Sequence, residues 1–302
     1  MSQPMEAVEK VVATELRDRN KFEAAEWEAL ERCVYLVNST PKYYFMLPLH
    51  FALIQRYGSF AAQDMHKVLA TEVPDHPICR QLAEEYGVEI LPIRAEEAGF
   101  LESRAAALRG LAAQGKWEFV LPMQEDFLLD RRDGMADWIR KGAMFQLKEG
   151  KGVASVRLMP CPGPKRPQSP AAAWWQLDKA HDEYGFVFQA TLWRLDSCLA
   201  WYEAITDRLE RMWPKATTLP ARRREIEIGA NFAENADGQR IFWELFEKRG
   251  ERHMAWQRAG PWSNAVYLCP WPYRPTAIVR GRVEPWAEEM AKREGMPFKA
   301  QA

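Results

Sequence analysis

The sequence predicts an α/β fold, a doubly wound mixed sheet flanked by helices, with a helical extension at the amino terminus. Two patterns lead to this prediction. Between residues 33 and 124, short apolar segments rich in β-branched and aromatic residues alternate with segments of helical periodicity. Such alternation is typical of βαβ units, whose right-handed crossovers build a parallel sheet. Residues 5–32 carry apolar positions at helical spacing among many charges, which predicts one or two amphipathic helices.

The first half of the chain supplies four predicted strands and three predicted helices. Gly58 and Gly87 lie where two helical patterns stop, as expected for helix ends. Pro48 fits the first turn of its helix, where a missing N–H is tolerated. We expect strands at 33–38, 66–73, 88–93 and 117–124, and helices at 45–58, 77–87 and 101–115.

The second half is less regular and richer in tryptophan, with ten of the 13 tryptophans between Trp174 and Trp286. An Asp-Ser pair at 196–197 is typical of a helix start. We expect strands at 153–160 and 184–195, an exposed proline-rich loop at 161–170, and helices at 133–150, 196–213 and 238–250. The chain is thus divided into an extension, residues 1–30, and one domain of two halves, residues 31–130 and 131–302.

The composition argues against several classes of protein. The 302 residues carry a formal net charge of −1, so no overall field favours nucleic acid or an anionic membrane, and only a local basic patch could bind either. The five cysteines are scattered and form no CxxC, which argues against a disulfide framework and a cysteine zinc site. The amino terminus lacks the apolar core of a signal peptide, and no window contains 18 uninterrupted apolar residues. We therefore expect a cytoplasmic protein without a transmembrane segment.

The stretch "VLPMQEDFLL" (120–129) places two adjacent carboxylates, Glu125 and Asp126, at the end of the fourth predicted strand. Ligands of open α/β sheets bind beyond the carboxyl ends of the strands. A carboxylate there can hold a divalent cation that neutralises a diphosphate. The alternative is a solvated turn, or an Asp that caps the next helix.

The order of these segments resembles a GT-A-type glycosyltransferase, similar to the family 2-like bacterial and viral members. The resemblance covers most of residues 33–285 and rests on "CVYLVN", "ATEV", "VEILPI", "SRAAALRGL" and "QEDF", followed by "FQATLWRLDSCLAWYEAI" (188–205) and "REIEIGANFAE" (224–234). In that family a D-x-D or E-D motif after the fourth strand meets the metal and diphosphate of the donor. Here residues 124–126 read Gln-Glu-Asp, a departure that puts strict metal dependence in question.

The resemblance implies transfer of a sugar from a nucleotide-sugar donor, with Mn²⁺ or Mg²⁺ and by an inverting mechanism. Residues 31–130 would bind the nucleotide sugar and residues 131–302 the acceptor. A saccharide acceptor is favoured, and a modified nucleobase in phage DNA stays open. Two alternatives remain: a nucleotidyltransferase, and a non-catalytic carbohydrate- or protein-binding domain on a transferase scaffold.

Candidate residues follow from the same resemblance, and for each an ordinary structural or solvent-exposed role is the alternative. Glu225 and Glu227 would share a face of an extended segment, so either could be the base that accepts the acceptor's hydroxyl proton. We choose Glu227. Asp126 would bind the metal or the diphosphate, and Glu125 would face the ribose. Arg104 would bind a phosphate. The nucleotide would be contacted by Asn38, Ser39 and Glu72, and the acceptor by Gln189 and Trp193.

Overall fold

The computed structural model describes most of the chain. The described residues are 24–57, 65–94, 100–130, 138–158, 174–212, 232–256, 273–274 and 276–298, with the single residues 164, 168 and 172. Most of the predicted extension, residues 1–30, and most of the predicted loop, residues 161–170, therefore lie outside the described residues. No helix in the described ranges is long and apolar enough to cross a membrane.

The fold is α/β, as predicted, with a central mixed sheet of eight strands in the order β3-β2-β1-β4-β8-β6-β9-β7. β1 pairs in parallel with β2 and β4, β2 with β3, and β6 with β9, whereas β8 and β7 run antiparallel to their neighbours. The strands are β1 (Cys33–Asn38), β2 (His66–Thr71), β3 (Glu89–Pro92), β4 (Phe119–Met123), β6 (Val153–Arg157), β7 (Trp174–Gln176), β8 (Thr191–Arg194) and β9 (Arg252–Trp256).

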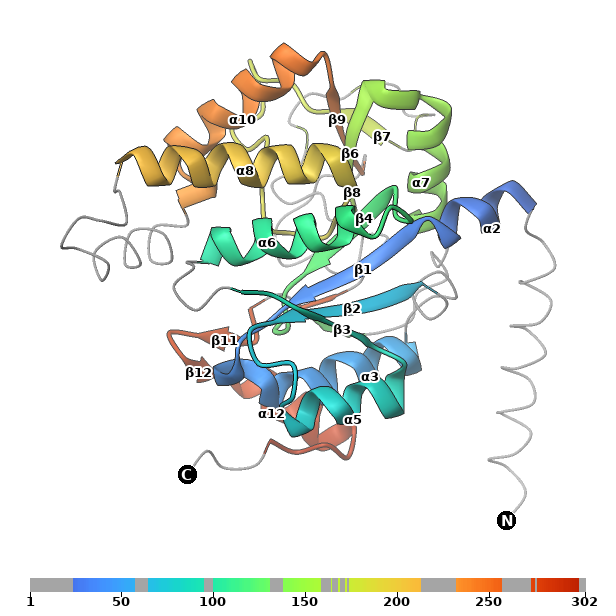
Figure 1. Cartoon of the computed structure of the whole chain (residues 1–302), viewed down its shortest axis with the longest axis vertical. Helices are drawn as coiled ribbons and strands as arrows, with labels where there is room; N and C mark the ends of the chain where they lie inside the picture. Colours follow the sequence, from blue (N-terminus) through green and yellow to red (C-terminus); the bar gives the residue numbers. More distant parts are fainter. Residues whose placement is uncertain are drawn as a thin grey trace.

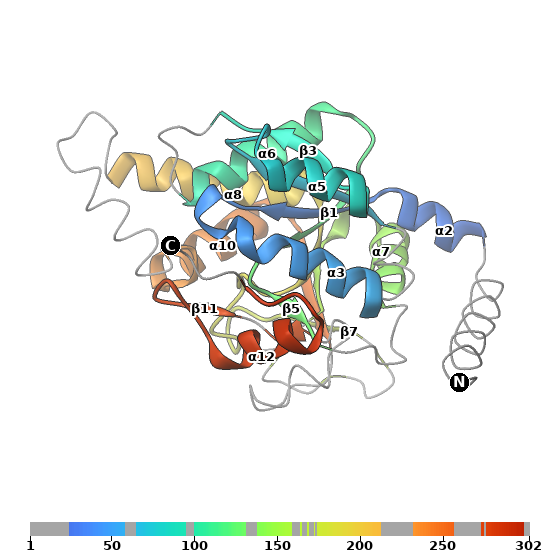
Figure 2. The same ribbon diagram turned by 90° about the horizontal axis from the view of Figure 1, so that it is seen from below.

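Helices cover both faces of this sheet (Figure 1). One face packs against α6 (Phe100–Ala113), α8 (Leu195–Met212) and α10 (Ala236–Arg249). The other packs against α3 (Leu47–Tyr57), α5 (Pro77–Tyr86) and α12 (Pro285–Arg293), and Figure 2 views the molecule from this side. The alternation of strand side chains explains the two layers, because Tyr35 and Val37 enter one core while Val34 and Leu36 enter the other.

The remaining elements lie at the ends of this framework. α2 (Ala24–Glu31) leads into β1, and a 3-10 helix, η1 (Pro41–Met46), joins β1 to α3. α7 (Trp138–Lys148) and the 3-10 turn η2 (Gly150–Gly152) precede β6, and η3 (Phe232–Glu234) precedes α10. Two small pairs of strands complete the list, β5 (Leu128–Leu129) with β10 (Tyr273–Arg274), and β11 (Ile278–Val279) with β12 (Arg282–Val283).

The predicted strand at 184–195 is wrong in its first part, because only β8, its last residues, joins the sheet. Side chains satisfy the backbone of the earlier residues in place of a neighbouring strand. Gln239 accepts from Phe186 N at 3.0 Å and donates to Phe186 O at 2.8 Å, and Glu234 accepts from Phe188 N at 2.7 Å. The apolar run in this segment reflects burial of a loop. The strands β7 and β9 and the helix α12 were not predicted.

Candidate functional site

Polar residues gather at one edge of the sheet, at the carboxyl ends of its parallel strands. β1 ends at Asn38, and β4 ends at Met123, directly before residues 124–126. Val37 pairs with Met123, so the polar residues that follow the two strands lie side by side. From β1 the chain adds β2 and β3 on one side and then β4 on the other, so the strand order reverses between β1 and β4. Open α/β sheets bind ligands at such a reversal.

Asn38 and Ser39, two predicted nucleotide-binding residues, are buried at this edge. Asn38 Nδ2 donates to Ala70 O of β2 at 3.4 Å, and Ser39 N donates to the same carbonyl at 3.2 Å. Asn38 Oδ1 has no hydrogen-bond partner among the residues that the structure describes. A buried acceptor without a partner costs free energy, so this oxygen is a candidate contact for a ligand donor.

Glu125 and Asp126 form a partly buried acidic pair in the turn after β4. Burial, and then the Asp126 carboxylate, raise the pKa of Glu125 to about 7, while the Arg104 guanidinium and the Ser39 hydroxyl act in the opposite direction. Burial also raises the pKa of Asp126 to about 6, against the lowering effect of the Ile278 N–H and of Arg104. Two carboxylates whose charge is disfavoured in this way are suited to a cation, which would stabilise their ionised forms.

A segment near the carboxyl terminus fixes the conformation of this turn. Ala277 N donates to Asp126 O at 3.0 Å, and Ile278 N donates to Asp126 Oδ2 at 3.4 Å. Tyr273 of β10 stacks on Phe127 with ring centroids 5.1 Å apart. Asp126 Oδ2 therefore already accepts a hydrogen bond from the backbone.

His50 of α3 is buried in the core near the acidic turn. His50 Nε2 lies 2.8 Å from the Tyr35 hydroxyl. Burial lowers the pKa of His50 to about 4, although the Glu125 backbone carbonyl acts in the opposite direction. His50 is thus a neutral ring at physiological pH, which keeps a further positive charge away from the site.

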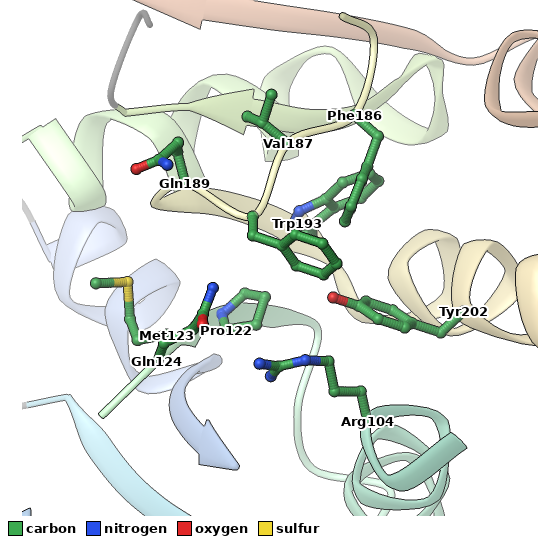
Figure 3. A pocket seen from close by; sticks show the side chains of 10 residues that line it. Arg104, Pro122, Met123, Gln124, Phe186, Val187, Gln189, Trp193 and Tyr202 are labelled. Atoms are coloured by element: carbon green, nitrogen blue, oxygen red, sulfur yellow. The ribbon is translucent and has the colours of Figure 1, made fainter. Parts of the chain in front are cut away.

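A pocket opens beside the acidic pair, between the ends of β4 and β8 and the helices α6 and α8 (Figure 3). It is a small pocket with a cavity volume of about 10 Å³, which is room for about one water molecule. The side chain of Arg104, which is 6% exposed, points into it from α6. The guanidinium carbon lies 4.1 Å from the centroid of the Phe100 ring and 5.8 Å from that of Phe188. The pocket is lined by Arg104, Pro122, Met123, Gln124, Phe186, Val187, Phe188, Gln189, Trp193 and Tyr202.

The two predicted acceptor-side residues line this same pocket. Gln189 accepts a short hydrogen bond from the Tyr273 hydroxyl, which also accepts from Ala190 N at 3.0 Å. Trp193 is only 3% exposed and packs within 6.0 Å of Phe246, ring centroid to ring centroid. Most of the Trp193 ring is therefore core, and only the part that reaches the pocket is available to a ligand.

The structure places the other predicted residues less informatively. Glu72 follows β2 at the same edge and is partly exposed. Glu225 and Glu227, the two predicted bases, lie outside the described residues. The structure therefore brings together Asn38, Ser39, Glu125, Asp126, Arg104, Gln189 and Trp193, and leaves the two predicted bases untested.

The donor set suits Mg²⁺ or Mn²⁺ only in part. Within the described ranges no group of three His, Cys, Asp or Glu side chains could hold a metal ion. Glu125 and Asp126 offer hard carboxylate oxygens, which these ions prefer, and Mg²⁺ is commonly held by one or two carboxylates together with substrate phosphates. The pair thus fits a cation that a diphosphate would help to coordinate.

Sequence reasoning missed several residues that shape the site. Tyr202 and Phe188 line the pocket. Tyr273 binds the side chain of Gln189, and the backbone of Ile278 binds the Asp126 carboxylate. Tyr202 lies four residues after Cys198 on the helix predicted at 196–213, so helical spacing could have placed both on the inward face. No local pattern marks the contacts of Tyr273 or Ile278, because their partners are distant in the sequence.

No protein-family model matches the chain, and no curated protein matches its sequence. Two solved structures of residues 1–349 of S. aureus TarS, one of them in complex with UDP, are similar with a TM-score of 0.42 and 11% sequence identity. Each match covers 75% of this chain and 58% of the TarS chain.

Proposed function

We propose that the chain is a glycosyltransferase of the GT-A type, which binds a nucleotide-sugar donor where the strand order reverses between β1 and β4. One observation carries the proposal. At the ends of these two parallel strands, a buried amide oxygen that has no partner among the described residues, Asn38 Oδ1, lies beside an acidic pair whose pKa values are raised. This is the edge at which open α/β sheets bind nucleotides, and the sequence resemblance points to the same residues.

The proposed roles follow from the chemistry of each group. Asn38 and Ser39 would contact the nucleoside. Asp126, with Glu125, would hold Mg²⁺ or Mn²⁺, which offsets the charge of the leaving diphosphate. The cation in turn favours the ionised forms of the two carboxylates, so its binding releases protons and strengthens as the pH rises. Glu227, with Glu225 as the alternative, stays the proposed base of an inverting transfer to a saccharide acceptor.

The test is calorimetric titration of UDP, GDP, CDP and dTDP, each with and without Mn²⁺. We expect one nucleotide to bind, with an affinity that Mn²⁺ increases and that falls between pH 8 and pH 5.5, because both acidic pKa values lie in or near this range. Asp126→Asn should abolish the effect of Mn²⁺, since it removes a charge and keeps an oxygen that can accept from Ile278 N. Asp207→Asn, on the exposed surface of α8, is the matched control.

Two outcomes would contradict the proposal. If none of the four nucleotides binds at millimolar concentration, the edge of the sheet is not a nucleotide site. If one binds and Asp126→Asn leaves the effect of Mn²⁺ intact, the acidic pair is only a structural turn. If a nucleotide binds as expected, hydrolysis of the matching nucleotide sugar in the absence of acceptor distinguishes a transferase from a binding domain that lacks catalysis.

A further inference from the structure

Glu234 is a partly exposed carboxylate at the edge of the sheet that holds the acidic pair. It ends η3, directly before α10, and its Oε1 accepts from Phe188 N at 2.7 Å. Phe188 lines the pocket in Figure 3 together with Gln124, the residue before the acidic pair, and Gln189, a predicted acceptor residue. Glu234 therefore lies next to the acceptor side of the proposed site.

The register of the strands explains this position. β8 runs antiparallel to β4 and to β6, so the loop that leads into β8 meets the carboxyl ends of both strands. Arg157, at the end of β6, donates to Tyr184 O at 3.1 Å and to Gly185 O at 2.7 Å. The same loop is bound from β6 by Arg157 and from the start of α10 by Glu234.

The backbone that carries Glu234 is closely packed. Asn235 caps α10, since its side chain accepts from Gly238 N at 3.0 Å. A Cβ at Gly238 would lie 2.4 Å from Ala233 O, so this approach of η3 to the helix requires glycine. The turn is thus fixed against the first turn of α10, and it presents Glu234 to the loop at Phe188.

The surroundings of Glu234 suit a carboxylate that accepts a proton. Burial raises its pKa, against the lowering effects of the Phe188 N–H and of the Arg157 charge. Burial also raises the pKa of the Tyr202 hydroxyl, which the Arg104 charge lowers and the Glu234 charge raises further. Since Arg104 acts on the acidic pair as well, electrostatic contact runs from Glu234 through Tyr202 and Arg104 to that pair.

The two oxygens of Glu234 have different surroundings. The bond from Phe188 N fixes Oε1, whereas Oε2 has no hydrogen-bond donor among the described residues. Within those residues Glu234 also belongs to no group of three side chains that could hold a metal ion. A carboxylate that is fixed through one oxygen and reachable at the other can accept a hydrogen bond from a substrate hydroxyl.

We propose that Glu234 binds the attacking hydroxyl of the acceptor and takes its proton. The inference rests on the proposed function and assigns to Glu234 the step that the sequence resemblance assigns to Glu227. The acceptor oxygen forms a bond to the anomeric carbon of the donor sugar while the bond from that carbon to the diphosphate breaks. The diphosphate leaves with the electron pair of the broken bond, and the hydroxyl proton passes to Oε2 of Glu234, which later releases it to water.

Donor hydrolysis tests this role, because water can take the place of the acceptor hydroxyl. The nucleotide that binds in the calorimetric titration is used as its conjugates with glucose, galactose, mannose and N-acetylglucosamine. Each conjugate is supplied at saturating concentration with Mn²⁺, and release of the nucleoside diphosphate is followed between pH 4.5 and pH 8.5. Binding of the free nucleotide to every variant is measured alongside.

Glu234→Gln removes the charge and keeps an oxygen that can accept from Phe188 N, so it should fold and bind the nucleotide like the wild type. We expect its rate of hydrolysis to fall by about 100-fold or more, the usual contribution of a general base. Glu227→Gln should keep most of the rate. Glu247→Gln, on the exposed surface of α10, is the matched control and should keep all of it.

The pH dependence distinguishes a base from a residue that only supports the loop. The wild-type rate should fall as the pH drops through the raised pKa of Glu234, because only the ionised carboxylate accepts a proton. The Phe188 amide signal of ¹⁵N-phenylalanine-labelled protein reports this ionisation directly, since Glu234 accepts from that N–H. The two titrations should give the same pKa, and this comparison in the wild type decides if Glu234→Gln does not fold.

The outcomes for the two proposals are separable. Failure of every nucleotide to bind overturns the proposed function. Nucleotide binding with no hydrolysis of any conjugate by the wild type overturns the role of Glu234, as does a Glu234→Gln variant that hydrolyses at the wild-type rate. A loss of rate in Glu227→Gln alone returns the step to Glu227 and leaves the proposed function standing. A Glu234→Gln variant whose nucleotide affinity falls as much as its rate shows that Glu234 only supports the fold of the site.

Discussion

Replacing Glu125 by Gln should stabilise the protein at alkaline pH. The folded state raises the pKa of this carboxyl from 4.5 to about 7, chiefly through burial and then through the charge of Asp126. Between these two values the folded protein holds a proton that the unfolded chain releases, so stability falls as the pH rises through this window. The full penalty is present above pH 7. The amide has the same shape and no charge, and it removes the penalty.

The size of the effect follows from the pKa difference. At about 1.4 kcal/mol per pKa unit, the shift corresponds to at most about 3 kcal/mol at pH 8.5 and to less than about 1 kcal/mol at pH 5. Because the side chain is partly exposed, water screens some of this energy, and a gain of about 1 to 3 kcal/mol is expected at the higher pH. Loss of the Glu125 charge also relieves Asp126, so the measured value belongs to the pair.

The assay is urea unfolding of the wild type and Glu125→Gln at pH 5 and pH 8.5. The expected result is a gain in unfolding free energy that is larger at pH 8.5 by about 1 to 2 kcal/mol. Glu84→Gln makes the same chemical change at an exposed position of α5, and should show no such difference between the two pH values. A gain that is equal at both values, or a loss at pH 8.5, would refute the assignment of Glu125 as a destabilised carboxylate.

Two further predictions concern the segment that forms one wall of the pocket. Gly185→Ala would place a methyl group 2.5 Å from Cδ1 of the buried Phe242 ring. This overpacking should lower the unfolding free energy, measured in urea, by about 1 to 3 kcal/mol. An unchanged unfolding midpoint would contradict this packing. Tyr273→Phe removes the hydroxyl that hydrogen-bonds to Gln189 Oε1 and Ala190 N, and should lower the unfolding free energy by about 1 kcal/mol in the same assay. An unchanged unfolding free energy would contradict a stabilising role of these two hydrogen bonds.

The first half of the sheet could be predicted from the sequence because its signals are local. The segments around Cys33–Asn38 and Phe119–Met123 are short apolar runs between helical patterns, and the structure has strands there. Parallel strands bring their carboxyl ends to one edge, so the meeting of Asn38 with the acidic pair follows from the element order. This part of the candidate site needed no knowledge of distant contacts.

The other parts of the site depend on contacts that no local pattern reveals. Asp126 is bound by Ile278, 152 positions further along the chain. The loop before β8 reads as a strand because its residues are apolar, yet Gln239 and Glu234 satisfy its backbone in place of a neighbouring strand. In the same way, the sequence leaves open whether Arg104 contacts a phosphate or is solvated, and only the fold shows that it is buried, with Nε unpartnered among the described residues.

The position of Arg104 relative to the acidic pair bears on the proposed donor site. Its charge lowers the pKa values of both Glu125 and Asp126, so the three groups are close enough to interact through space. It nevertheless forms no ion pair with either, because the ring of Phe100, one helical turn earlier, lies against the guanidinium. Had the three groups paired, the guanidinium would have fewer free donors and the carboxylates fewer free acceptors. In the proposed function, their separation keeps the carboxylates available to a cation and the edge of the guanidinium available to the diphosphate.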